Sequence, residues 1–194
     1  MIAENEKRGT TLGKTKVSIK AVITILLLVM IPVVSFLIVS ELGIIKTPPD
    51  KMFVGEDAFP QGWVRTYFEI EKYPSPVINW TAVVSFSNNS SAAREEALIR
   101  ITSYNSPLVA HEEYLRSIGG TNMNMTRISL GDEGHFELWA GSEPNPAVVE
   151  YVFRENNILV IIVFSKYSPA DQYQPNPYQP WMDEVARLQA SMIR

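Results

Sequence analysis

The chain has 194 residues and a formal net charge of −4, with 13 Pro, 10 Gly and no Cys. Its length favours one ordinary domain, because domains commonly hold about 100–200 residues. A composition that is 46% apolar and 20% charged excludes a disordered chain. The negative charge excludes a generally basic nucleic-acid binder. The absence of Cys excludes a disulfide scaffold, thiolate catalysis and Cys-bound metal centres.

A continuous apolar segment near the N-terminus predicts a membrane anchor. Residues 21–40 contain no charged side chain, and a helix of about 20 residues spans about 30 Å, the thickness of a bilayer's hydrocarbon core. The segment is longer than the apolar part of a signal peptide and lacks a small-x-small exit. We therefore expect an uncleaved transmembrane helix over 21–43 that contacts the lipid bilayer.

The charges beside this segment predict its orientation. Residues 1–20 contain five cations, whereas the 15 residues after Ser40 contain only Lys46 and Lys51. By the positive-inside rule, residues 1–20 form a cytoplasmic tail of a single-pass protein in the cell membrane. Residues 44–55 contain Pro48-Pro49 and are expected to be a linker. Residues 56–194 are then an acidic extracytoplasmic domain, and its lack of Cys favours a prokaryotic source.

Hydrophobic periodicity predicts strands in the first half of this domain. The strands cover residues 63–72, 79–86 and 96–104, and the last two are expected to form a hairpin. Ser106-Pro107 supplies an N-cap followed by proline, and Gly119-Gly120 ends the helix that begins there. The expected apolar stripe of this helix consists of Leu108, His111, Leu115 and Ile118.

The second half predicts more strands and a closing helix. Strands are expected over 125–130, 135–140, 147–154 and 158–164, with a turn at 131–134 and a hairpin at Asn156-Asn157. The run 158–164 has no polar side chain, so we expect a central strand covered on both faces, with both helices over one face. The closing helix covers 180–193, with an apolar stripe of Trp181, Val185, Leu188 and Met192. The expected fold is α+β: a mainly antiparallel sheet of six or seven strands with two helices packed on it.

One cluster of side chains suggests acid–base chemistry. Asp132, Glu133 and His135 lie close together in the sequence, but their spacing matches no recognised metal motif. A turn followed by a half-exposed strand histidine explains the same pattern, and His111 is expected to be a packed residue. No nucleophile elbow, zinc-protease helix, phosphate loop or dinucleotide fingerprint is present in the sequence. We therefore expect no catalytic residue, cofactor or metal, and an envelope hydrolase that uses this cluster is the alternative.

Aromatic residues and sequons supply further candidate sites. The candidate surface for a ligand or partner consists of Tyr167, Tyr173, Tyr178 and Trp139. The alternative is that a Tyr/Pro segment packs its rings over the sheet before the last helix. The candidate glycosylation sites are Asn79, Asn88, Asn89 and Asn124, with the pair at 88–89 expected in a hairpin turn.

The C-terminal third resembles a pattern found in prokaryotic cell-envelope α+β domains of uncharacterised function. The pattern consists of the Gly131-Asp132-Glu133 turn, a Phe153-Arg154-x-x-Asn157 hairpin before an apolar strand, and a closing helix. The resemblance implies the fold and the compartment, and it carries over no catalytic residue. Arg154 is expected to pair with the two acids across the sheet. The expected function is a non-catalytic binding or interaction module, an accessory subunit whose partner is a membrane protein or an envelope polymer.

Overall fold

The structure is a computed structural model, and the residues that it describes are 23–24, 26–31, 47–72, 75–88, 94–119, 125–139, 146–167 and 177–193. The chain divides into two units, residues 1–39 and residues 40–194. The described residues of the first unit are helical, and their large apolar side chains are exposed. Among the described residues, no helix combines the length and the apolar character needed to cross a membrane. The tail expected over 1–20 and most of the anchor expected over 21–43 lie outside the described residues.

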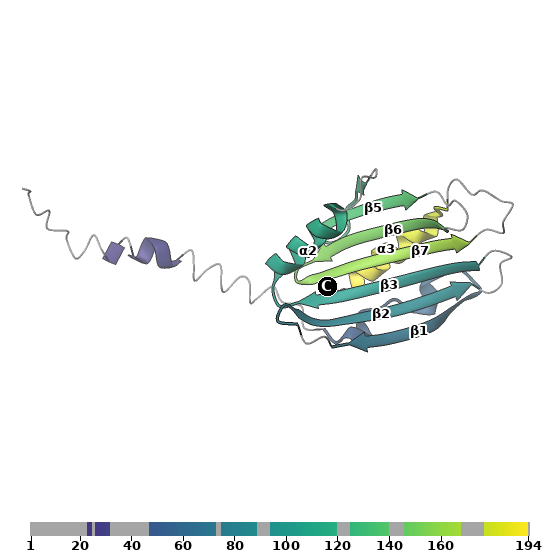
Figure 1. Cartoon of the computed structure of the whole chain (residues 1–194), viewed down its shortest axis with the longest axis horizontal. Coiled ribbons are helices and arrows are strands. Elements are labelled where there is room, and N and C mark those ends of the chain that lie inside the picture. Colours follow the sequence, from purple (N-terminus) through teal and green to yellow (C-terminus); the bar gives the residue numbers. More distant parts are fainter. Residues whose placement is uncertain are drawn as a thin grey trace, which may run out of the picture. The chain divides into compact units, whose positions relative to one another are not determined.

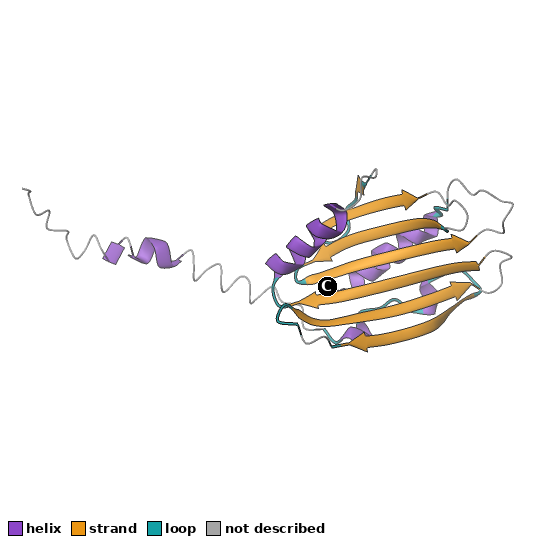
Figure 2. Cartoon of the chain, viewed as in Figure 1, coloured by secondary structure: helices purple, strands orange, loops and turns teal. Residues whose placement is uncertain are grey.

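The second unit is built on one seven-stranded sheet in which every neighbouring pair is antiparallel (Figure 1, Figure 2). Its strands are β1 (Trp63–Glu71), β2 (Ile78–Asn88), β3 (Arg94–Tyr104), β4 (Thr126–Arg127), β5 (Glu133–Trp139), β6 (Ala147–Glu155) and β7 (Ile158–Tyr167). Their spatial order is β1-β2-β3-β7-β6-β5-β4. The predicted α+β class and antiparallel sheet are confirmed, although only two residues of the strand expected over 125–130 pair with a neighbour.

Two helices pack on opposite faces of this sheet. Helix α2 (Pro107–Gly119) follows β3 and covers Val152 and Leu159, whereas α3 (Pro180–Ile193) follows β7 and packs on the other face. In Figure 1, α2 lies in front of the sheet and α3 behind it. The expectation that both helices cover one face is wrong. Side-chain alternation along a strand separates two faces, but it does not assign a helix to either.

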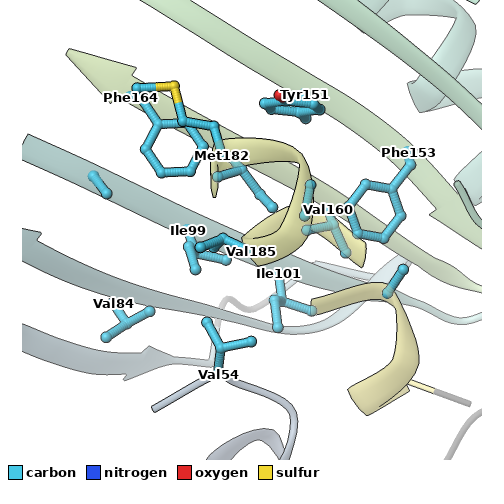
Figure 3. Close-up of a cluster of buried hydrophobic side chains, with 14 of the residues drawn as sticks. Val54, Val84, Ile99, Ile101, Tyr151, Phe153, Val160, Phe164, Met182 and Val185 are labelled. Atoms are coloured by element: carbon cyan, nitrogen blue, oxygen red, sulfur yellow. The ribbon is translucent and has the colours of Figure 1, made fainter. Parts of the chain in front are cut away.

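The main core lies between the sheet and α3 (Figure 3). The central strand β7 contributes four almost fully buried side chains to it: Ile158, Val160, Ile162 and Phe164. On the opposite face of β7, Leu159 is buried under α2, while Ile161 and Val163 remain partly exposed. The central position predicted for this strand is confirmed, but its α2 face is only partly covered.

The buried face of α3 differs from the predicted stripe. Leu188 is 39% exposed and Met192 is 41% exposed. The buried residues are Met182, Val185, Ala186, Gln189, Ala190 and Ile193. Gln189 is buried because its amide donates to the Met52 carbonyl at 2.5 Å and accepts from the Val54 amide at 3.2 Å. The segment expected as a linker over 44–55 thus contributes Met52 and Val54 to the core. Two short 3-10 helices, η1 (Pro49–Lys51) and η2 (Glu56–Ala58), flank these two residues.

The buried face of α2 was also misassigned from the sequence. Leu108 is 57% exposed and Leu115 is 48% exposed, whereas Ala110 and Tyr114 are buried. A small residue at 110 allows the helix to approach the sheet, and the tyrosine ring supplies the apolar contact. The expected stripe of Leu108, His111, Leu115 and Ile118 included neither of these two buried residues.

Candidate functional site

Arg154 on β6 joins the two acids of the predicted cluster. Its guanidinium Nε donates to Glu133 Oε2 at 3.1 Å, and its NH1 group lies 3.2 Å from Asp132 Oδ2. The same NH1 group donates to the Asn156 carbonyl at 2.7 Å. Only 13% of the Arg154 side chain is exposed, but 44% of the Asp132 side chain and 27% of the Glu133 side chain are, so the pair with Glu133 is the better shielded of the two. The predicted pairing of Arg154 with both acids is confirmed.

Two backbone positions create this arrangement. Gly131 has φ +60°, and a Cβ atom there would lie 2.3 Å from the Arg154 carbonyl oxygen. Only glycine fits such a close approach in a left-handed conformation. Asn156 turns the β6–β7 hairpin with φ 54°, as the sequence predicted for this pair, and its amide donates to Asp132 Oδ2 at 2.8 Å. The acidic turn is therefore tied to the hairpin on the neighbouring strands.

The two histidines extend this network to α2. His111 Nδ1 lies 2.8 Å from Glu133 Oε2, and the Tyr114 hydroxyl is hydrogen-bonded to His135 Nδ1. Burial alone would raise the pKa of Glu133, but the hydrogen bonds with His111 and Arg154 outweigh it and hold that pKa below its usual value. Burial raises the pKa of Tyr114 to about 12, and the Glu133 charge adds to the rise. These contacts attach α2 to β5.

The contacts of Asp132, Glu133 and His135 leave these side chains little freedom to act as a general acid or base. Glu133 accepts from Arg154, Asp132 is ion-paired with Arg154 and accepts from the Asn156 amide, and His135 is half-buried against Tyr114. A general acid or base needs its titrating atom within reach of a substrate, but these atoms already hold structural partners. Within the described ranges, no group of three or more His, Asp and Glu side chains is arranged to hold a metal ion.

A second acidic pair lies on the α2 face of the sheet and was not predicted. Glu137 of β5 is directly opposite Glu150 of β6. Glu137 is 3% exposed, and neither of its carboxylate oxygens has a hydrogen-bond partner among the residues that the structure describes. Burial, and then the neighbouring Glu137, raise the pKa of Glu150. The sequence shows a glutamate in each of these two strands, but the strands must be aligned in the β5–β6 register before the two residues can be predicted to face each other.

Of the candidate aromatic residues that the structure describes, Tyr178 packs on the α3-face core, whereas Trp139 and Tyr167 belong to strands β5 and β7. Tyr178 is partly buried against the α3-face core, and its hydroxyl donates to Asp183 Oδ2 at 2.7 Å. This contact matches the packing alternative for Tyr178. Tyr167, 37% exposed, lies at the end of β7 under the Arg94 guanidinium, and Trp139 is half-buried on β5. Tyr173 lies outside the described residues.

Asp183 lines a small groove on the α3 face. Its Oδ1 atom accepts a hydrogen bond from the Tyr151 hydroxyl at 2.5 Å, so each carboxylate oxygen accepts from one tyrosine, Oδ1 from Tyr151 and Oδ2 from Tyr178. The groove has a volume of about 240 Å³ and is lined by Ile128, Ser129, Leu130, Tyr151, Asp183 and Arg187. Burial, and then the hydrogen bond to Asp183, raise the pKa of Tyr151. The Tyr151 and Tyr178 hydroxyls both remain protonated and donate to Asp183, so they fix the first turn of α3 in place.

The sequons fall in different environments. The Asn79 side chain donates to the Tyr104 carbonyl at 2.8 Å and to Ser103 Oγ at 3.3 Å. Asn88 is the last residue of β2, where its amide donates to Glu95 Oε2 at 3.1 Å. The expectation of a hairpin turn at 88–89 is therefore wrong for Asn88. Asn89 and Asn124 lie outside the described residues.

The edge strand β1 presents the most exposed apolar side chains of the sheet. Seven consecutive residues after Trp63 are exposed, although the strand pairs with β2 on both sides of Thr66. The large apolar ones are Val64 at 43%, Tyr67 at 48%, Phe68 at 40% and Ile70 at 39%. The sequence predicted this strand correctly, but its edge position depends on the order of the whole sheet.

Comparisons with known protein families, with curated proteins and with solved structures found no match to this chain.

Proposed function

We propose that the protein is a membrane-anchored, non-catalytic binding module whose folded domain lies outside the cytoplasm. The observation that carries this proposal is the network centred on Arg154. It occupies Asp132 and Glu133, two of the three residues that an enzyme built on the predicted cluster would need. The third, His135, is hydrogen-bonded to Tyr114. Groups that hold an element in place are poor general acids and bases, because catalysis would require them to break those contacts.

The membrane location in this proposal depends on the sequence. The uncharged run over 21–40 has the length of a bilayer core, and the cations before it favour a cytoplasmic N-terminus. A domain held at the membrane surface needs no catalytic centre to act as an accessory subunit of an envelope complex. It needs a stable fold and an accessible surface.

The absence of Cys makes the topology directly measurable. We would introduce one cysteine at a time, as Thr10→Cys in the tail and as Glu112→Cys on the exposed side of α2. A maleimide that cannot cross membranes is expected to label Glu112→Cys in intact cells or spheroplasts and Thr10→Cys only after permeabilisation. The reverse pattern would contradict the orientation, and labelling of both sites in intact cells would contradict the anchor.

The non-catalytic part is tested by co-purification from mild detergent. We expect a partner to remain bound to the double variant Asp132→Ala/His135→Ala as long as the variant stays folded, because these residues hold α2 and the hairpin rather than a substrate. A thermal melt of each preparation reports the folding. Turnover of an envelope substrate by the native chain that this folded variant loses would support the hydrolase alternative instead.

A further inference from the structure

We infer that the outer edge of β1 is the binding surface of this module, and that it takes an extended segment of a partner in which basic and apolar side chains alternate. This inference rests on the proposed function, because it names the surface through which such a module would act. An unpaired strand edge offers a row of backbone donors and acceptors, and adding a strand to it is a common mode of peptide recognition.

The two edges of the sheet differ in the way this inference requires. At one edge, β4 has only two residues, Thr126–Arg127, so β4 itself offers little backbone for pairing. At the other, β1 has nine residues, and β2 is its only strand neighbour among the described elements (Figure 1). Natural sheets commonly protect their edges with short strands, bulges or charges. The β4 edge has the first protection, whereas β1 has a bulge at Thr66 and two acidic residues but remains long and partly apolar.

The usable part of β1 is its second half. The register shifts between Arg65 and Tyr67, which marks a bulge at Thr66. Just before it, the Arg65 amide donates to Glu56 Oε1 at 2.9 Å, so η2 already occupies this part of the edge. Beyond the bulge, residues 67–71 pair regularly with β2 and carry no such cap among the described contacts. A partner strand would therefore pair along residues 67–71, which we call the open edge.

The side chains of the open edge define the chemistry of its partner. Phe68 and Ile70 point to the α3 face, where Phe53 meets Phe68 edge-on with ring centroids 5.7 Å apart. Tyr67, Glu69 and Glu71 point to the opposite face. A strand added here is complementary if its side chains are apolar on the first face and basic on the second, because opposite charges and apolar pairs stabilise neighbouring strands.

The same pattern disfavours a second copy of the chain. Antiparallel self-pairing that uses all of residues 67–71 is centred on Glu69, and it sets this carboxylate directly against its own copy. Like charges in directly opposed positions destabilise a strand pair. The open edge thus favours a basic segment over itself.

The test uses the full chain in mild non-ionic detergent and a short synthetic peptide of alternating Lys and Val. Fluorescence anisotropy of the labelled peptide measures its dissociation constant, and amide hydrogen exchange locates the site. We expect slower exchange within the open edge and no binding of a Glu/Val peptide. A Lys/Val peptide N-methylated on alternate backbone amides has the same charge but cannot pair with a strand, so it is expected to bind much more weakly.

Charge-reversed variants sharpen the test. Glu69→Lys is expected to weaken binding about fivefold, and Glu69→Lys/Glu71→Lys by more than about tenfold, which are the effects of reversing one and two cross-strand pairs. Glu112→Lys makes the same change of charge on exposed α2 and is the matched control, expected to leave the dissociation constant unchanged. Thermal melts confirm that each variant is folded.

Three results would overturn the inference. The first is equal binding of the N-methylated peptide, and the second is exchange protection elsewhere in the domain. The third is a dimer, detected by light scattering, that Glu69→Gln strengthens, since the occupant would then be a second copy. The proposed function fails separately, on the cysteine labelling and on the Asp132/His135 variant, neither of which alters β1.

Discussion

Replacing Ile162 and Ile161 by alanine should have clearly different costs, although the two residues are neighbours in the central strand. Ile162 points into the core beneath α3 and is 0% exposed. Ile161 points to the α2 face, is partly exposed and packs only at the border of the smaller cluster. The same change of side chain thus probes two differently covered faces of one strand.

The magnitude follows from what each change removes. Isoleucine to alanine deletes three carbons, worth about 2.4 kcal/mol at about 0.8 kcal/mol for each fully buried one. At Ile162 the surrounding side chains leave a closed cavity, which brings the expected loss of unfolding free energy to about 3–5 kcal/mol. At Ile161 part of the side chain is already in water and the space left is open, so about 1 kcal/mol is expected.

Urea denaturation of the full chain in mild detergent, followed by tryptophan fluorescence, measures both losses. The two variants should share the slope of the parent protein and differ in midpoint. Equal losses would refute the argument, since they would mean that the α2 face of β7 is as fully covered as the α3 face. A larger loss for Ile161→Ala would mean that the smaller cluster dominates the stability of the domain.

Four further variants test single contacts of the folded domain. Gly131→Ala should cost at least about 2 kcal/mol in a urea melt, because the added Cβ meets the Arg154 carbonyl and φ is +60°; a neutral result would mean that the turn relaxes freely. Gln189→Leu should cost about 2 kcal/mol or more by the same measurement, since it leaves the buried Met52 carbonyl and Val54 amide without partners. Retained stability would show that the 52–54 segment detaches without penalty. Glu133 has a lowered pKa in the folded state, so its stabilisation is present above its unfolded pKa and is lost as the pH falls through the folded value. Glu133→Gln should therefore lower the free energy of unfolding by about 1.5–3 kcal/mol near pH 7 and by less near pH 4. Glu150→Gln replaces a carboxyl whose pKa is raised, so it should stabilise the domain near pH 7 and lose this gain in acid. Melts near pH 7 in which both variants change the stability in the same direction would contradict this account.

Much of the secondary structure could be predicted because its signals are local. Pro107 and Pro180 mark the first residues of α2 and α3, and alternation of side chains located the strands. The Asn156-Asn157 turn was identifiable because asparagine tolerates a positive φ better than most residues. Each of these signals lies within a few residues of the feature that it determines.

The features that were missed depend on contacts distant in the sequence. The buried face of α3 includes Gln189, a polar residue that is accommodated only because the backbone at Met52 and Val54 satisfies its amide. The acidic pair at Glu137 and Glu150 depends on a strand register, and the exposure of β1 depends on the order of all seven strands. Hydrophobic periodicity carries no information about any of these pairings.

The amide of Gln189 also has a mechanical consequence. Residues 52–54 lie between the expected membrane segment and β1, and they are fastened to α3 by two hydrogen bonds within the core. Tension applied to the chain before residue 52 would therefore load the α3 layer first. Phe53 in the same segment packs against Phe68, so part of this load would also reach the open edge of β1.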